Sequence, residues 1–133
     1  YHYFVQVGKD PFNFDYAWQI RYELDLDKMN EAAISLIGKQ DFSSFAKIHT
    51  DVKTHICDVK FAEWTRNGNE LKFTITADRF LRNMVRAVTG TLIEIGRGRK
   101  PASWMEELIR TGTRSDAGQS VPGSPLFLDN VKY

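Results

Sequence analysis

Three segments of the chain have the hydrophobic pattern of β-strands. Residues 1–8 are rich in aromatic and β-branched types, which favour extended structure. Residues 54–66 and 70–77 alternate in hydrophobicity and flank Asn67-Gly68-Asn69, a sequence typical of a tight hairpin turn. In residues 54–66 neither set of alternating positions is cleanly polar, so we expect both faces of that strand to be partly covered.

Helical patterns occur in two shorter segments, residues 27–37 and 101–110. In the first, Asp25 or Asp27 can cap the start of the helix, and Gly38 can end it as a left-handed cap residue. The second begins with a proline, which suits the first turn of a helix.

The most regular pattern predicts a helix over residues 79–95 that ends at Gly96. Its hydrophobic residues recur three and four positions apart, which places them on one stripe. They are Phe80, Leu81, Met84, Val85, Val88, Leu92 and Ile95.

The remaining segments are less regular. Asp10 to Asn13 has the composition of a turn, residues 16–24 could be strand or irregular, and Asp41 to Phe45 reads as a short turn. Residues 112–125 form a loop rich in Gly, Ser and Pro, and residues 126–133 resemble a closing strand. The order β, α, ββ, αα, β predicts an α+β fold: an antiparallel sheet with helices packed on one face.

Length and composition agree with one domain covering residues 1–133. No apolar run reaches the 18 residues that would suggest a membrane span. The single cysteine, Cys57, excludes an internal disulfide and fits a reducing, cytoplasmic setting. Because the chain opens at Tyr1, inside a strand-like run and without a methionine, we interpret it as a fragment or excised domain.

Charge is distributed unevenly along the chain. Taken alone, the total of 18 basic and 17 acidic residues disfavours nucleic acid as a partner. However, residues 1–66 carry 8 basic and 10 acidic residues, and residues 67–133 carry 10 and 7. Six basic residues lie between positions 79 and 100 against one acid, Glu94. Such a cluster is compatible with a solvated helix face or with phosphate contacts.

Four motifs in one register extend along the whole chain. They are FLRNMVRAVTGTLIEIGRG at residues 80–98, Leu24-Asp25 with Met29 to Gly38 and DFSSF at 41–45, AGQSVP at 117–122 before the last strand, and Tyr1-His2-Tyr3. Together they resemble the C-terminal half of the tRNA pseudouridine synthase A (TruA) family. That family's N-terminal half carries G-R-T-D-A-G with the catalytic aspartate, and this chain contains no such half.

The resemblance implies an enzyme domain that isomerises uridine to pseudouridine in the anticodon stem-loop of tRNA, at tRNA positions 38–40. It implies the pseudouridine synthase fold, no metal, no organic cofactor, no membrane association, a cytoplasmic location and a homodimer in the full-length protein. The 133-residue chain alone is predicted to be inactive. The alternatives are a non-catalytic RNA-binding module and a structural domain that supplies a dimer surface.

Candidate site residues follow from the family motifs. Arg86 matches the arginine that forms a salt bridge with the catalytic aspartate, and Tyr1 matches the active-site tyrosine that stacks on the target base. Tyr3, on the same strand face, is the second candidate for that tyrosine. With Tyr3, Met84 and Leu92 are predicted to line the substrate pocket, although a core position would look the same in the sequence.

The other basic residues of the cluster are predicted to contact the tRNA backbone, which gives affinity without sequence choice. They are Arg79, Arg82, Arg97, Arg99 and Lys100. Asp116 lies in Arg114-Ser115-Asp116-Ala117-Gly118, which imitates the catalytic motif in the wrong context, so we do not expect it to be catalytic. Cys57 stands where many family members have arginine, and we expect it to act as a small hydrophobic residue.

Overall fold

The structure is a computed structural model and describes residues 1–8, 17–47, 54–111, 117–123 and 125–127. The strands are β1 (His2–Val7), β2 (Trp18–Ile20), β3 (Gly38–Asp41), β4 (Ile56–Asn67), β5 (Glu70–Ala77) and β6 (Leu126–Phe127). The helices are α1 (Leu26–Ile34), α2 (Met84–Gly96) and α3 (Ser103–Thr111), with a 3₁₀ turn at Ser43–Phe45.

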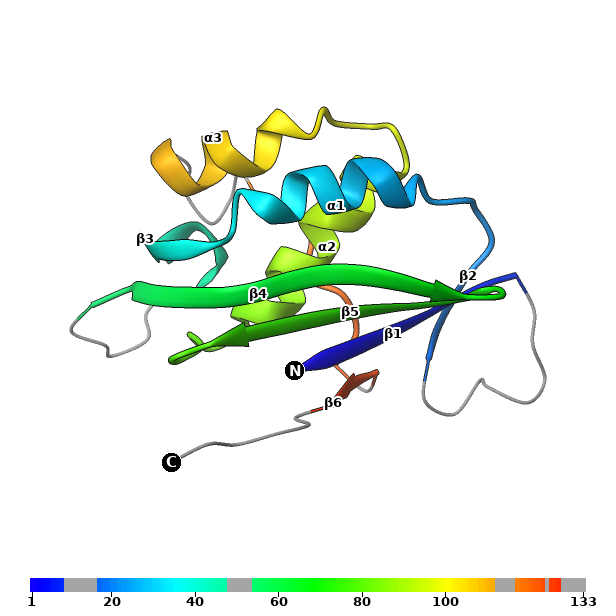
Figure 1. Ribbon diagram of the computed structural model, residues 1–133, viewed down its shortest axis with the longest axis horizontal. Helices are drawn as coiled ribbons and strands as arrows, with labels where there is room; N and C mark the ends of the chain where they lie inside the picture. Colours follow the sequence, from blue (N-terminus) through cyan, green and yellow to red (C-terminus); the bar gives the residue numbers. More distant parts are fainter. Residues whose placement is uncertain (9–16, 48–53, 112–116, 124, 128–133) are drawn as a thin grey trace.

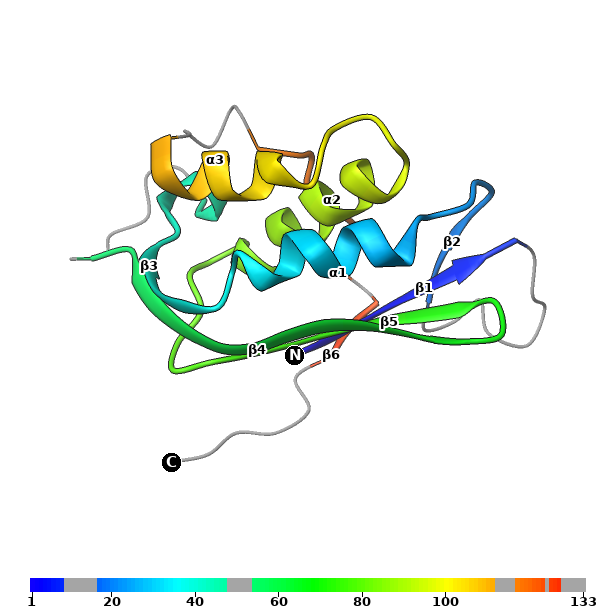
Figure 2. The same ribbon diagram turned by 45° about the horizontal axis from the view of Figure 1, so that its top comes forward.

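The strands form one mixed sheet in the order β2-β1-β5-β4-β3, and β6 pairs with β1 beside β2. All three helices lie on the same face of this sheet (Figures 1 and 2). The predicted α+β fold with helices on one face is therefore confirmed. The prediction of a purely antiparallel sheet misses one pair, because β2 runs parallel to β1.

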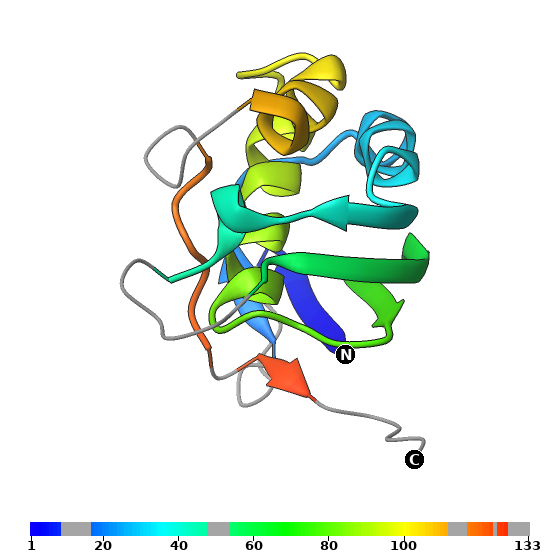
Figure 3. The ribbon, with the colours of Figure 1, turned by 90° about the vertical axis from the view of Figure 1, so that its left-hand side faces the viewer.

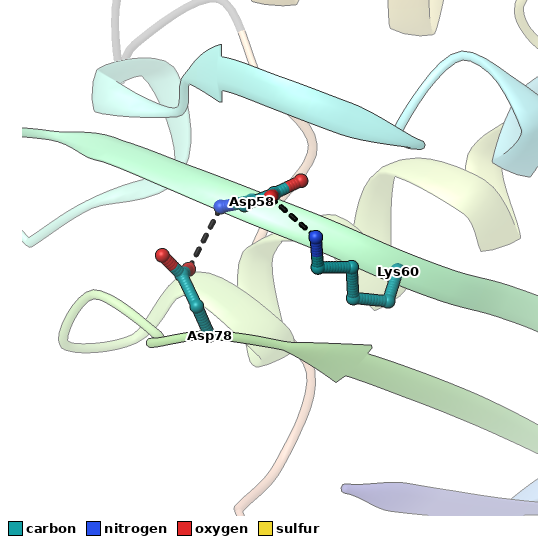
Figure 4. A network of polar contacts seen from close by, with 3 residues as sticks. All are labelled: Asp58, Lys60 and Asp78. Atoms are coloured by element: carbon teal, nitrogen blue, oxygen red, sulfur yellow. Dashed lines mark hydrogen bonds and ion pairs between the residues drawn. The ribbon is translucent and has the colours of Figure 1, made fainter.

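The ambiguous alternation of β4 has a structural cause. A register shift between Val59 and Phe61 inserts an irregularity opposite β5, and such a bulge exchanges the two faces of a strand. Before it, Val59 is buried, and after it Trp64 is buried although its position has the opposite parity. Near the shift, Asp78 accepts a hydrogen bond from the backbone of Asp58 at 2.8 Å, and Lys60 pairs with the Asp58 carboxylate at 2.6 Å (Figure 4).

Helix α1 begins where the sequence predicts, because the Asp25 side chain accepts a hydrogen bond from the backbone of Lys28 at 3.2 Å. The helix ends at Ile34, three residues earlier than predicted. Gly38 has the positive φ of 111° that we expected of it, but it opens strand β3 instead of capping the helix. The polar composition of β3 hid this edge strand from the sequence analysis.

Helix α2 packs against α1, α3 and the 3₁₀ turn and is buried on nearly all sides. Its only residues that are not buried are Arg86 and Glu94. The predicted start at residue 79 is wrong: the helix begins at Met84, because Asn83 has a left-handed backbone with φ 70°. Phe80 and Leu81 belong to the hydrophobic stripe of the sequence, yet they precede the helix.

Other predicted boundaries differ by small amounts or fall outside the described residues. The predicted segment 16–24 contains the three-residue strand β2, and α3 starts two residues after Pro101. The predicted closing strand is present as β6, and the rest of that segment and the turn at 10–13 lie outside the described residues. Within the described ranges, no helix has the length and hydrophobicity needed to cross a membrane.

Candidate active site

Two cavities meet at the start of α2, and Arg86 lines both of them. The smaller, of about 350 Å³, has a wall made of Tyr1, the segment 80–86 and Leu126. The larger, of about 480 Å³, runs along one side of α2. It is lined by Trp18, Tyr22, Arg86, Gly90, Ile93, Glu94, Arg97, Gln119, Ser120, Val121 and Pro122.

Arg86 is a half-buried cation on a helix whose other residues, apart from Glu94, are buried. Its Nε donates a hydrogen bond to the backbone oxygen of Val121 at 2.9 Å. Within the described residues, no aspartate or glutamate forms an ion pair with Arg86. A charge removed from water needs such partners, and the acceptor that the described residues supply to the Arg86 side chain is the Val121 backbone oxygen.

A segment that we call the strap, residues 118–122, runs alongside α2 (orange in Figure 3). The Gly118 backbone donates to Thr91 Oγ1 at 3.0 Å, and the Val121 backbone donates to the Arg86 carbonyl at 3.3 Å. At Gly90 the approach is so close that an added Cβ would lie 1.9 Å from the Gln119 carbonyl oxygen. The strap therefore fixes the side of α2 that carries Arg86.

The two candidate tyrosines have different environments. Tyr1 is half-buried, lines the smaller cavity and packs edge-on against Phe80 with ring centroids 5.0 Å apart. Tyr3 is fully buried, lines neither cavity and donates its hydroxyl to the Pro122 carbonyl at 2.7 Å. Burial raises the pKa of Tyr3, and the nearby Arg86 charge opposes that rise only in part. Tyr3 thus joins β1 to the strap, and it lines neither of these two cavities.

The two apolar residues predicted for the pocket, Met84 and Leu92, also have different locations. Met84 is fully buried and contributes to the wall of the smaller cavity. Leu92 is fully buried in the core and lines neither cavity. The structure therefore gives Leu92 a packing role, which the hydrophobic stripe could not distinguish from a pocket wall.

The basic residues predicted to contact RNA fall into two groups at opposite ends of α2, whose 13 residues span roughly 20 Å. Arg79 and Arg82 precede the helix. Arg79 Nη1 donates to the carbonyls of Thr54 and Ile56 at 3.0 and 3.1 Å, which ties down the start of β4. Arg82 is exposed beside the smaller cavity.

The second group, Arg97, Arg99 and Lys100, follows the end of α2. Glu94 pairs with Arg97 at 3.5 Å and with Arg99 at 3.7 Å, and the Arg97 guanidinium lies 3.9 Å from the centre of the Tyr22 ring. Lys100 lies over the Trp104 ring at 5.2 Å. Arg97 is thus held at the far end of the larger cavity, while most of the Arg99 side chain is exposed.

Several site residues were not identified from the sequence. Trp18 and Tyr22 line the larger cavity, and Asn83 and Ser120 join α2 to the strap. The only sequence signals were aromatic residues on both sides of a short apolar run and the family-like AGQSVP segment. Neither signal states which helix these residues contact, because the contacts join positions far apart in the chain.

Other reactive groups do not extend the site. Cys57 is fully buried, and this burial raises the pKa of its thiol, as expected for a small hydrophobic residue. Asp116 lies outside the described residues. Among the residues that the structure does describe, no group of three or more His, Cys, Asp or Glu could hold a metal ion.

Comparison with known proteins identifies the family of this chain. The sequence model described as tRNA pseudouridine synthase matches residues 32–133, and the chain belongs to that family. Its relatives named tRNA pseudouridine synthase A include proteins of Bacteroides fragilis, 51% identical over 134 residues, and Bacillus subtilis, 37% identical over 135 residues. These matches cover 100% of this chain and 53% and 55% of the relatives. The chain therefore spans about half the length of the curated relatives that it matches.

Proposed function

We propose that this chain is the C-terminal half of a tRNA pseudouridine synthase that isomerises uridine in the anticodon stem-loop, at tRNA positions 38–40. The chain supplies Arg86 and Tyr1 to a site whose catalytic aspartate belongs to the other half of the enzyme. The reaction breaks the N1–C1′ bond of uridine, turns the base and rejoins it to the ribose through C5. It needs no metal or organic cofactor.

The observation that carries this proposal is the state of Arg86. Its Nε is held by Val121, and in the described part of the chain no carboxylate pairs with the rest of its guanidinium. An arginine beside a carboxylate keeps that carboxylate ionised and oriented. A catalytic aspartate brought to Arg86 would give this half-buried charge a partner and would itself be kept ionised.

Tyr1 and the smaller cavity fit the substrate side of the reaction. The target nucleotide must leave its stack before its glycosidic bond can react. Tyr1 presents an aromatic ring at the cavity that Arg86 also lines, and unstacked bases are commonly held on such rings. In the expected arrangement, the target base therefore stacks on Tyr1, and the catalytic carboxylate lies between the ribose and Arg86.

The complete gene product tests this proposal directly. It should release tritium from tRNA labelled at uridine C5, because C5 exchanges its hydrogen for the new glycosidic bond. The 133-residue chain alone should release none, since it lacks the carboxylate. Release by the isolated chain would contradict the division of the site between two halves. An inactive complete product that still binds tRNA would instead support an RNA-binding module.

Replacing both Arg97 and Arg99 by alanine should weaken tRNA binding by the complete gene product. Each lost phosphate contact lowers the slope of log K against log salt by nearly one unit. We expect a decrease of about one to two units, measured by filter binding at several salt concentrations. Arg66→Ala is the control, because Arg66 is exposed on the hairpin of β4 and β5. A double variant with an unchanged slope would remove these arginines from the RNA surface.

The remaining expectations about the whole enzyme are proposals of the same kind. We expect it to form a homodimer and to act in the cytoplasm, where its tRNA substrate is found. Sedimentation equilibrium of the complete gene product measures the first directly.

A further inference from the structure

The turn before α2 has an unusual backbone. In the described part of the chain, Asn83 is the one residue other than glycine with a positive φ, 70°. Such a conformation is costly for a residue with a side chain and persists where surrounding contacts fix it. Asn83 ends the turn that follows β5, and α2 starts at Met84, so that Arg86 lies in the first turn of the helix.

The side chain of Asn83 supplies the fixing contact. Its Nδ2 donates to Ser120 Oγ at 2.7 Å, which joins positions 37 residues apart in the sequence. The backbone carbonyl of Asn83 also accepts the first helical hydrogen bond, from Ala87 at 3.0 Å. One residue therefore sets the start of the helix and anchors the strap.

The next residue of the strap contacts Arg86. Val121 accepts from Arg86 Nε at 2.9 Å and donates to the Arg86 carbonyl at 3.3 Å. Ser120 and Val121 are adjacent in the strap, and their partners Asn83 and Arg86 are three residues apart at the start of α2. If Ser120 moves, the Val121 carbonyl moves with it, and the guanidinium loses the acceptor that sets its direction.

We propose that Asn83 and Ser120 are positioning residues for Arg86, which they hold through the strap at the wall shared by the two cavities. This inference rests on the proposed function, because the positioned group is the arginine of the pseudouridine synthase site. Neither residue needs to touch the uridine. Asn83 and Ser120 restrict the orientation of the Arg86 guanidinium, so that its two Nη groups are already directed for binding the catalytic carboxylate.

Variants of the complete gene product separate the two contributions of Asn83. Asn83→Gly keeps a backbone that tolerates positive φ and removes the amide, and Ser120→Ala removes the acceptor from the same bond. We expect each to lower kcat about tenfold or more, since small misplacements of catalytic groups cost up to about 100-fold. KM and tRNA affinity should stay unchanged. The double variant should be no slower than the slower single variant, because both remove one bond.

Two further variants distinguish positioning from stability. Ser120→Thr keeps the hydroxyl and should recover most of the wild-type kcat. Asn30→Ala removes an amide that bonds the backbone of Trp64 at 2.7 and 3.1 Å, far from Arg86 in the sequence. It should lower the melting temperature and leave kcat at 25 °C unchanged.

The proposal is overturned if Asn83→Gly and Ser120→Ala turn over at the wild-type rate. It is also overturned if kcat falls only in proportion to the fraction of unfolded protein, or if the two losses multiply in the double variant. A wild-type protein that binds tRNA but makes no pseudouridine would instead contradict the proposed function itself.

Discussion

Arg86→Ala in the complete gene product is expected to abolish pseudouridine formation while tRNA still binds. Removing one preorganised charge-stabilising group costs roughly 10²–10³ in kcat, and in the proposed site the variant would also leave the catalytic carboxylate without its counter-charge. Binding should change little, because affinity comes from the many phosphate contacts of the surface. Tritium release and filter binding measure the two quantities on the same preparation.

Arg86→Lys refines this result. Lysine keeps the positive charge but lacks the planar fork that can bond Val121 and a carboxylate together. Its turnover should fall between those of the wild type and the alanine variant. Arg66→Ala, at an exposed position of β4, serves as the control and should keep full activity. Normal turnover by Arg86→Ala would exclude this arginine from the chemistry.

Gly90→Ala should reduce both stability and activity. In a helix interior, alanine normally favours the folded state over glycine by about 1 kcal/mol. At Gly90 the added Cβ would lie 1.9 Å from the Gln119 carbonyl oxygen, so the strap must shift. We expect a net loss of about 1–3 kcal/mol and a melting temperature lower by roughly 3–10 °C, measured by circular dichroism.

The same shift should lower kcat, because the strap carries Val121, which holds Arg86. Glu31→Ala provides a comparison, since Glu31 is exposed on α1 and substitutions at such sites change stability by less than about 0.5 kcal/mol. A Gly90→Ala protein as stable and active as the wild type would show that the strap can move without consequence.

Most of the secondary structure could be predicted because its signals are local. The predicted strand 70–77 matches β5, and the end of α2 falls at Gly96 as expected. Periodicity failed where the surroundings of a residue, not its neighbours in the chain, set its backbone. The stripe that begins at Phe80 predicts a longer helix. Within that stripe, however, Asn83 has a left-handed backbone conformation and its side chain bonds Ser120.

The candidate site divides in the same way. The motif around Arg86 could be recognised from the sequence, and the structure places Arg86 and Tyr1 at one cavity. The sequence also predicted Tyr3 in the substrate pocket; in the structure Tyr3 lines neither cavity, and its hydroxyl donates a hydrogen bond to the Pro122 carbonyl. Strand alternation shows which face a side chain is on, and it does not show whether another segment already covers that face.

The sequence by itself determined the α+β class, the family and the identity of the candidate arginine, because hydrophobic periodicity and motif order are properties of the chain alone. The tertiary structure decided three further features. They are the parallel pairing of β2, the start of α2 at Met84, and the strap that orients Arg86. Each depends on contacts between distant segments, and those contacts are decided only when the chain packs around one core.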